Sequence, residues 1–216
     1  APFEGSLAFV TRQADDFLGG IPGWDWLFPA VASIDDGKHP DEFIAEQVKH
    51  AAVTLVVNPI IRMQLACFGA TPNQARVATL AGLVRDGANL DEAANRTVTD
   101  ASLSASSLTN AEFVVHLDQT MWGRIGSGNL AVTRRRRLDQ GLSRGALLRE
   151  VVQERDYRIS TAAQVRTSTV WMSMLGRTMP KANLDNWSAL DKTDPKALTN
   201  LAANLRGSDE YRNRVT

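Results

Sequence analysis

The sequence of 216 residues contains a single cysteine, Cys67, so no disulfide framework can support the fold. Cys67 precedes Phe68 in an apolar stripe, which predicts a buried and unreactive thiol. Neither positive nor negative charge is in excess, because 24 lysine and arginine residues balance 24 aspartate and glutamate residues. This balance gives no indication of nucleic acid as a partner. The longest apolar run, 51–57, is much shorter than the roughly 18 residues of a membrane span, so we expect none.

Recognisable patterns for catalysis and metal binding are equally scarce. His39, His50 and His116 lie far apart, without the spacing of zinc ligands. The doublets 15–16 and 35–36 are acidic but lack the alternating oxygen ligands of a calcium loop, and we interpret them as solvated helix ends. Neither a Ser/His/Asp signature nor a glycine-rich phosphate loop is present. We therefore expect no metal, no cofactor and no enzymatic activity.

The sequence does contain a recurring glycine signal. An apolar residue followed by glycine occurs at intervals of 50, 54 and 53 residues. The four pairs are Leu18-Gly19, Phe68-Gly69, Trp122-Gly123 and Leu175-Gly176. A further glycine stands 18 residues after each of the first three, at Gly37, Gly87 and Gly141. A repeat of this period indicates a supersecondary unit copied in tandem, each copy too small to bury its apolar face alone.

Each unit is predicted to contain three short helices. In the fourth unit, Val170, Trp171 and Met174 follow helical spacing up to Gly176, which favours a helix end because glycine accepts positive φ. A second helix follows with Leu184, Trp187 and Leu190 as its apolar positions, and Asp194-Pro195 is a strong start signal for a third. The predicted fold is all-α, with units 1–57 (divergent), 58–110, 111–164 and 165–216 packed into one helical array.

Two units carry further shared residues. Arg124 follows Gly123 and Arg177 follows Gly176, and these units close with Asp156-Tyr157 and Glu210-Tyr211. This pattern resembles the bacterial family called domain of unknown function 4214 and, more distantly, the linker domains of phycobilisomes. The first two units have Gly20 and Ala70 in place of the arginine, and they lack the closing tyrosine. The resemblance implies an all-helical module of secreted or cell-surface bacterial proteins, with no catalytic residues and no agreed ligand.

The shared residues suggest a structural motif. We expect Arg124 to bond near Asp156-Tyr157, and Arg177 near Glu210-Tyr211, so that each arginine ties the end of a first helix to the close of its unit. A cation at a helix C-terminus is also favoured by the helix dipole.

The run Arg134–Arg137 has two interpretations. It is a solvated helix face balanced by nearby acids, or it contacts phosphate, sulfate or acidic polysaccharide through Arg135 and Arg136. Four consecutive helical residues turn through about 400°, so they cannot all face one way. Arg134 lies eleven residues after Gly123, in the column held by Leu80 and Trp187 in their units, and should be partly buried against a carboxylate.

The five tryptophans fall into two groups, predicted core residues and residues that could be exposed. Trp122, Trp171 and Trp187 follow helical stripes and are predicted to be core residues. Trp24 and Trp26 flank Asp25, and at least one ring is expected to be exposed, as a binding platform or interface anchor.

The predicted function is a non-catalytic interaction or scaffold module that contacts a protein partner or a surface polysaccharide. The alternative is a glycan- or anion-binding module that uses the exposed tryptophan and arginine residues. The start Ala1-Pro2-Phe3, without Met, favours a mature end left by signal-peptide cleavage, and we expect export.

Overall fold

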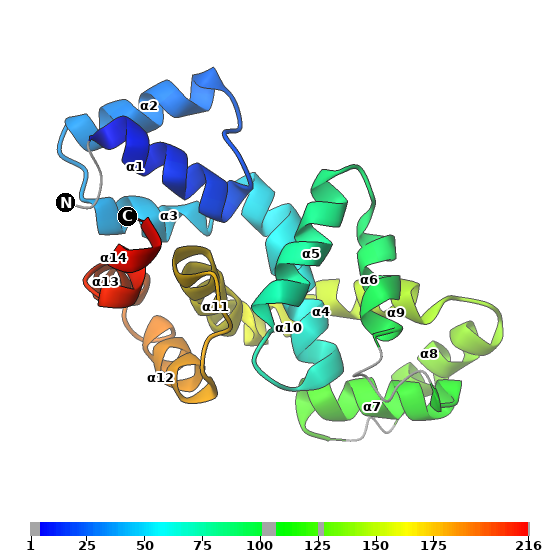
Figure 1. Ribbon diagram of the computed structural model, residues 1–216. Coiled ribbons are helices and arrows are strands. Elements are labelled where there is room, and N and C mark those ends of the chain that lie inside the picture. Colours follow the sequence, from blue (N-terminus) through cyan, green and yellow to red (C-terminus); the bar gives the residue numbers. More distant parts are fainter. Residues whose placement is uncertain (1–4, 101–106, 125–127, 216) are drawn as a thin grey trace. The chain divides into compact units, whose positions relative to one another are not determined.

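A computed structural model describes residues 5–100, 107–124 and 128–215, and these residues form helices and no β-strand (Figure 1). The fold class is therefore all-α, as the sequence predicts. Every helix in these ranges is too short or too polar to cross a membrane. The residues 1–3, on which the expectation of export partly rests, lie outside the described ranges.

The contacts within the chain divide it into two compact units. Unit 1 joins Ala1–Asn58 to Ala163–Thr216, and unit 2 is Pro59–Ala162. Unit 1 thus combines the first and fourth segments expected from the sequence, and unit 2 combines the second and third. The helices of unit 1 are α1 (Ser6–Gln13), η1 (Ala14–Leu18), α2 (Trp24–Asp35), α3 (Pro40–Gln47), η2 (Val53–Val57), α11 (Ala162–Leu175), α12 (Lys181–Asp191), α13 (Ala197–Arg206) and α14 (Asp209–Val215). Those of unit 2 are α4 (Asn58–Phe68), α5 (Gln74–Arg85), α6 (Leu90–Val98), α7 (Asn110–Trp122), α8 (Asn129–Asp139), α9 (Arg144–Gln153) and α10 (Arg155–Ser160).

The four glycines of the repeat signal each follow the end of a helix. Gly19, Gly69, Gly123 and Gly176 have φ values of 78°, 59°, 66° and 65°. These are left-handed conformations, which cost L-residues with a side chain considerably more than they cost glycine. Here the sequence signal and the backbone agree, because the conformation at each helix end is a local property.

Some features differ from the sequence prediction. The first helix of the chain passes into a π-helical segment, η1, and a second such segment, η2, precedes α4. Two additional helices, α10 and α14, follow the third helices of their segments. Leu190, expected to be apolar core, is 46% exposed, and Trp187 on α12 is only half-buried. The predicted start at Asp194-Pro195 is a turn, and α13 begins at Ala197.

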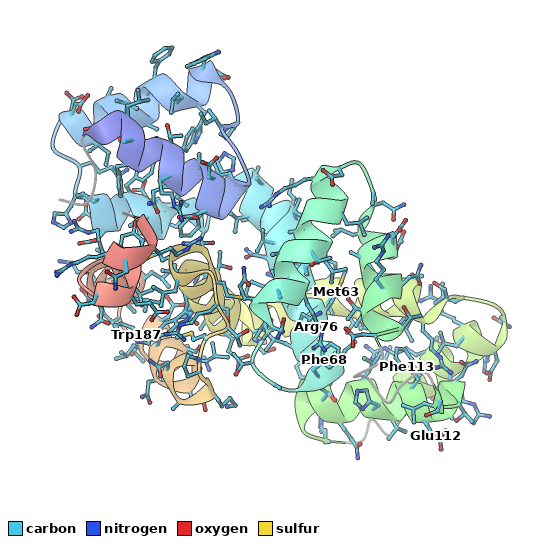
Figure 2. All side chains as sticks on the ribbon, viewed as in Figure 1. Met63, Phe68, Arg76, Glu112, Phe113 and Trp187 are labelled. Carbon is cyan, nitrogen blue, oxygen red and sulfur yellow. The ribbon has the colours of Figure 1, made fainter. Side chains whose placement is uncertain are left out.

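The core of unit 2 lies among α4, α7 and α9. Met63, Phe113 and Leu148 are completely buried in one cluster, against which Phe68 packs. Figure 2 labels Met63, Phe68 and Phe113 of this cluster. Helices α6 and α9 cross closely at Gly145, where an added Cβ would lie 2.7 Å from the backbone nitrogen of Asn95. The absence of a side chain at position 145 therefore sets how near these two helices can approach.

The core of unit 1 joins residues from opposite ends of the chain. Gln13 in α1 donates a hydrogen bond from Nε2 to the hydroxyl of Tyr211 in α14 at 3.1 Å, and both side chains are buried. Arg206 in α13 donates from Nε and Nη2 to the two carboxylate oxygens of Asp41 in α3, at 2.6 and 3.1 Å. Side-chain contacts between residues more than 150 positions apart thus hold unit 1 together.

Candidate functional site

Unit 2 contains a cavity of about 590 Å³ where the end of α7 meets the start of α8 and the junction of α9 with α10. Its described lining combines one aromatic ring, one glycine, two aliphatic residues, three arginines and three carboxylates. These residues are Asp118, Trp122, Arg124, Gly128, Leu130, Ala131, Arg134, Glu154, Arg155 and Asp156. Cavities of this size with a few converging polar groups are the usual sites of small-ligand binding.

Arg134 forms the buried end of this cavity. Its side chain is 6% exposed, and Nη1 donates to Oδ1 of Asp118 at 2.8 Å. Nη2 donates to both carboxylate oxygens of Glu154, at 2.7 and 2.9 Å. The expectation that Arg134 is buried and paired with a carboxylate is confirmed. Burial raises the pKa of Asp118, and this effect outweighs the opposing attraction of Arg134.

The other arginines of the run point outward. Arg135 is exposed and makes a 3.5 Å ion pair with Asp139, one turn along α8. Arg137 donates from both Nη atoms to Glu150 of α9, at 2.6 and 2.9 Å. Arg136 is exposed and forms no ion pair with any described carboxylate. The predicted division of the run by helical geometry is therefore confirmed, and the surface part offers Arg135 and Arg136 to solvent.

The mouth of the cavity has both an aromatic and a charged part. Trp122, expected to be core, is half-buried and meets the ring of Tyr157 edge-on, with centroids 5.6 Å apart. Arg124, Arg155 and Asp156 are exposed around it. An aromatic face beside guanidinium and carboxylate groups can stack on a sugar ring and bind its hydroxyl or carboxylate groups.

The two expected arginine ties have different outcomes. Arg177 donates to both carboxylate oxygens of Glu210, with Nη2 2.7 Å from Oε2, so this pairing is confirmed. The hydrogen bond holds the pKa of Glu210 below its ordinary value. No hydrogen bond or ion pair links Arg124 with Asp156 or Tyr157 in the described part of unit 2. Arg124 and Asp156 line the cavity instead, because α10 directs the exposed Asp156 and the buried Tyr157 to different sides.

A second candidate surface lies on α2 of unit 1. Trp24 is 69% exposed and stacks on Phe28, which is 64% exposed, with centroids 5.6 Å apart and planes 24° apart. Asp25 beside Trp24 is exposed, whereas Trp26 is half-buried against Phe43 and His50. Exposure of at least one tryptophan is thus confirmed.

The two tryptophans do not form a joint platform. Residues two apart on a helix are turned about 200° from each other. Trp24 is instead paired with Phe28, and the four-residue spacing of these two aromatic residues is the sequence signal that predicts such a pair.

Cys67 and the three histidines do not line the cavity. Cys67 is fully buried, and burial raises the pKa of its thiol to about 12, as expected for an unreactive core cysteine. Its carbonyl oxygen lies 2.7 Å from Nε2 of His116. Neither His116 nor His50 lines the cavity, and no group of three or more His, Cys, Asp or Glu residues in the described ranges could hold a metal ion.

No protein-family model, no curated protein and no solved structure matches this chain.

Proposed function

We propose that the chain is a non-catalytic interaction module of an exported or cell-surface bacterial protein, built from four quasi-equivalent three-helix repeats. The supporting observation for the repeats is the order of the helices. A first helix ends at each of the four glycines, and two more helices follow before the next copy. The triplets are α1/η1–α2–α3, η2/α4–α5–α6, α7–α8–α9 and α11–α12–α13.

The aromatic pair Trp24–Phe28 carries the proposed interaction. Most large aromatic side chains gain free energy from burial, and exposed apolar patches on soluble proteins often mark binding surfaces. Two stacked rings, each more than 60% exposed on one helix, form such a patch. Ile21, which precedes α2, is another apolar residue exposed in this region of the sequence, at 43%. If a partner buried both rings, they would act as an interface anchor, because a few buried aromatic residues provide most of the binding energy at many interfaces.

A crosslinking experiment tests this proposal. A photoreactive phenylalanine derivative is placed at position 28 of the whole chain, with position 190 as the control because Leu190 is also exposed in unit 1. The chains are incubated with a bacterial envelope preparation and irradiated. We expect a discrete adduct from position 28 that Trp24→Ala abolishes. Equal adducts from positions 28 and 190, or none from position 28, would contradict the proposal.

Glycan or anion binding is the second candidate function, and the cavity in unit 2 favours it. Arg124 and Arg155 are exposed beside Trp122 and form no ion pair with a described carboxylate, so their guanidinium groups are available to an acidic sugar. An array of neutral and acidic glycans tests this function. We expect binding that is confined to acidic glycans and lost in Arg124→Gln and Arg155→Gln. Arg212→Gln is the control because Arg212 is exposed and does not line the cavity, and an equal loss in that variant would indicate nonspecific charge attraction.

A further inference from the structure

Arg62, on α4 in unit 2, is a buried cation without a counter-charge. It is only 9% exposed, and its Nε–H has no acceptor. No carboxylate among the described residues forms an ion pair with it. A charge taken out of water is costly unless hydrogen bonds and an opposite charge replace the lost hydration. Every other arginine of unit 2 that is half-buried or more donates a side-chain hydrogen bond, which makes Arg62 distinct. These arginines are Arg76, Arg134, Arg144 and Arg149.

Two described groups act on the charge of Arg62, and only one of them adds to this imbalance. Burial lowers the pKa of the Arg62 guanidinium, and the positive charge of Arg158 on α10 lowers it further. The hydroxyl of Tyr157 acts in the opposite direction. Tyr157 is 2% exposed, whereas Arg158 is exposed. Arg62 thus interacts with a second guanidinium group and a phenol hydroxyl, and no described carboxylate forms an ion pair with Arg62 or Arg158.

A corresponding position in unit 1 shows what is missing. Arg12 stands seven residues before the helix-ending Gly19, as Arg62 stands seven before Gly69. Arg12 makes a 2.9 Å ion pair with Asp16, four residues later. Four residues after Arg62 the chain has Ala66, a fully buried methyl group. Unit 1 thus carries its own carboxylate at a place where unit 2 has none.

We propose that Arg62 binds an oxyanion, in the place that the Asp16 carboxylate occupies in unit 1, with Arg158 and the Tyr157 hydroxyl as additional donors. The planar guanidinium presents paired N–H groups that match phosphate, sulfate or carboxylate oxygens. A bound anion would neutralise the buried charge and give Nε an acceptor. The burial of Arg62 and its lack of a partner hold whether or not the helix triplets are related repeats, and the site is separate from the Trp24–Phe28 surface.

Thermal unfolding of the whole chain in chloride buffer, with added inorganic phosphate, sulfate or acetate, tests the proposal. We expect at least one of the three anions to raise the midpoint by about 3–6 °C at about ten times its dissociation constant. Comparison of the three distinguishes a tetrahedral anion from a carboxylate. In Arg62→Met the shift should disappear, while the midpoint without anion stays equal or rises because an uncompensated charge is removed. Arg212→Met, which removes an exposed arginine of unit 1, is the control and should keep the shift.

Ala66→Asp is the complementary variant. It supplies a carboxylate one turn from Arg62, so the midpoint without anion should rise and the response to anions should vanish. If this variant does not fold, Arg62→Met still decides the question. Three results would overturn the proposal: no anion shifts the wild-type midpoint, Arg62→Met keeps the shift, or Arg62→Met lowers the midpoint in anion-free buffer, which would show that the protein itself already satisfies Arg62.

Discussion

Arg214 donates a hydrogen bond from Nη2 to Oδ1 of Asp16 at 2.9 Å, across 198 positions of sequence. Nη1 of the same guanidinium donates to the carbonyl oxygens of Ser173 and Met174, at 2.7 and 2.5 Å. These carbonyls belong to the last turn of α11, where backbone acceptors lack partners within the helix. One side chain near the end of the chain therefore fastens α14 to both η1 and α11.

Arg214→Met should lower the free energy of unfolding by about 2 kcal/mol. The substitution leaves the Asp16 carboxylate, whose side chain is only 6% exposed, with Arg12 as its remaining partner, and it frees two carbonyl groups. Urea denaturation followed by circular dichroism measures the change. Arg212→Met is the control because Arg212 is largely exposed and its ion pair with Asp209 is long, at 3.6 Å. This substitution should change the free energy of unfolding by less than about 0.5 kcal/mol. Equal effects of the two substitutions would contradict this role of Arg214.

Gly145→Ala should lower the free energy of unfolding by about 1–3 kcal/mol. The new methyl carbon would lie 2.0 Å from Oδ1 of Asn95 and 2.7 Å from its backbone nitrogen, so α6 and α9 would have to separate. Gly82→Ala in the middle of α5 is a matched control, since nothing lies within 4 Å of an added Cβ. The free energy of unfolding of that variant should rise by up to about 1 kcal/mol, because alanine has a higher helix propensity than glycine. Denaturant midpoints of the two variants should therefore move in opposite directions from the wild type.

The Arg177–Glu210 pair should make a pH-dependent contribution to stability. The pKa of Glu210 in the folded chain lies below the ordinary value of 4.5, since Arg177 donates hydrogen bonds to the ionised form. A lowered carboxyl pKa stabilises the folded chain at pH values above 4.5, and this contribution is lost as the pH falls through the folded-state pKa. Carboxyl chemical shifts from NMR titration should show the Glu210 pKa returning towards its ordinary value in Arg177→Gln. A Glu210 titration unchanged by that substitution would exclude the pair in solution.

Arg134→Met should cost about 3 kcal/mol of unfolding free energy, because it leaves the buried Asp118 carboxylate without its ion-pair partner. Arg136→Met removes an exposed arginine from the same helix and should be close to neutral. Thermal and urea denaturation of the two variants compares them directly. Similar stability of both variants would mean that the Asp118–Arg134–Glu154 contacts contribute little to the fold.

The sequence allowed the inward position of Arg134 to be predicted because helical geometry forbids four consecutive side chains from facing one way. It also allowed the Arg177–Glu210 pair to be predicted from shared residues in two segments. The same reasoning failed for Arg124, since the pattern does not state how α10 turns Asp156. It also failed for Asp16, expected to be solvated at a helix end, because the arginine that covers it comes from the far end of the chain.

Local chemistry is what the sequence by itself determined: helices throughout, and their ends at glycines whose positive φ depends on neighbouring residues alone. Tertiary structure decided which segments share a core, which aromatic ring remains in water and which buried charge lacks a partner. Those properties depend on contacts between residues far apart in sequence, such as Gln13 with Tyr211 and Asp41 with Arg206. A pattern with a period of about fifty residues describes each segment, but the burial of Arg62 and the exposure of Trp24 arise only when the segments pack.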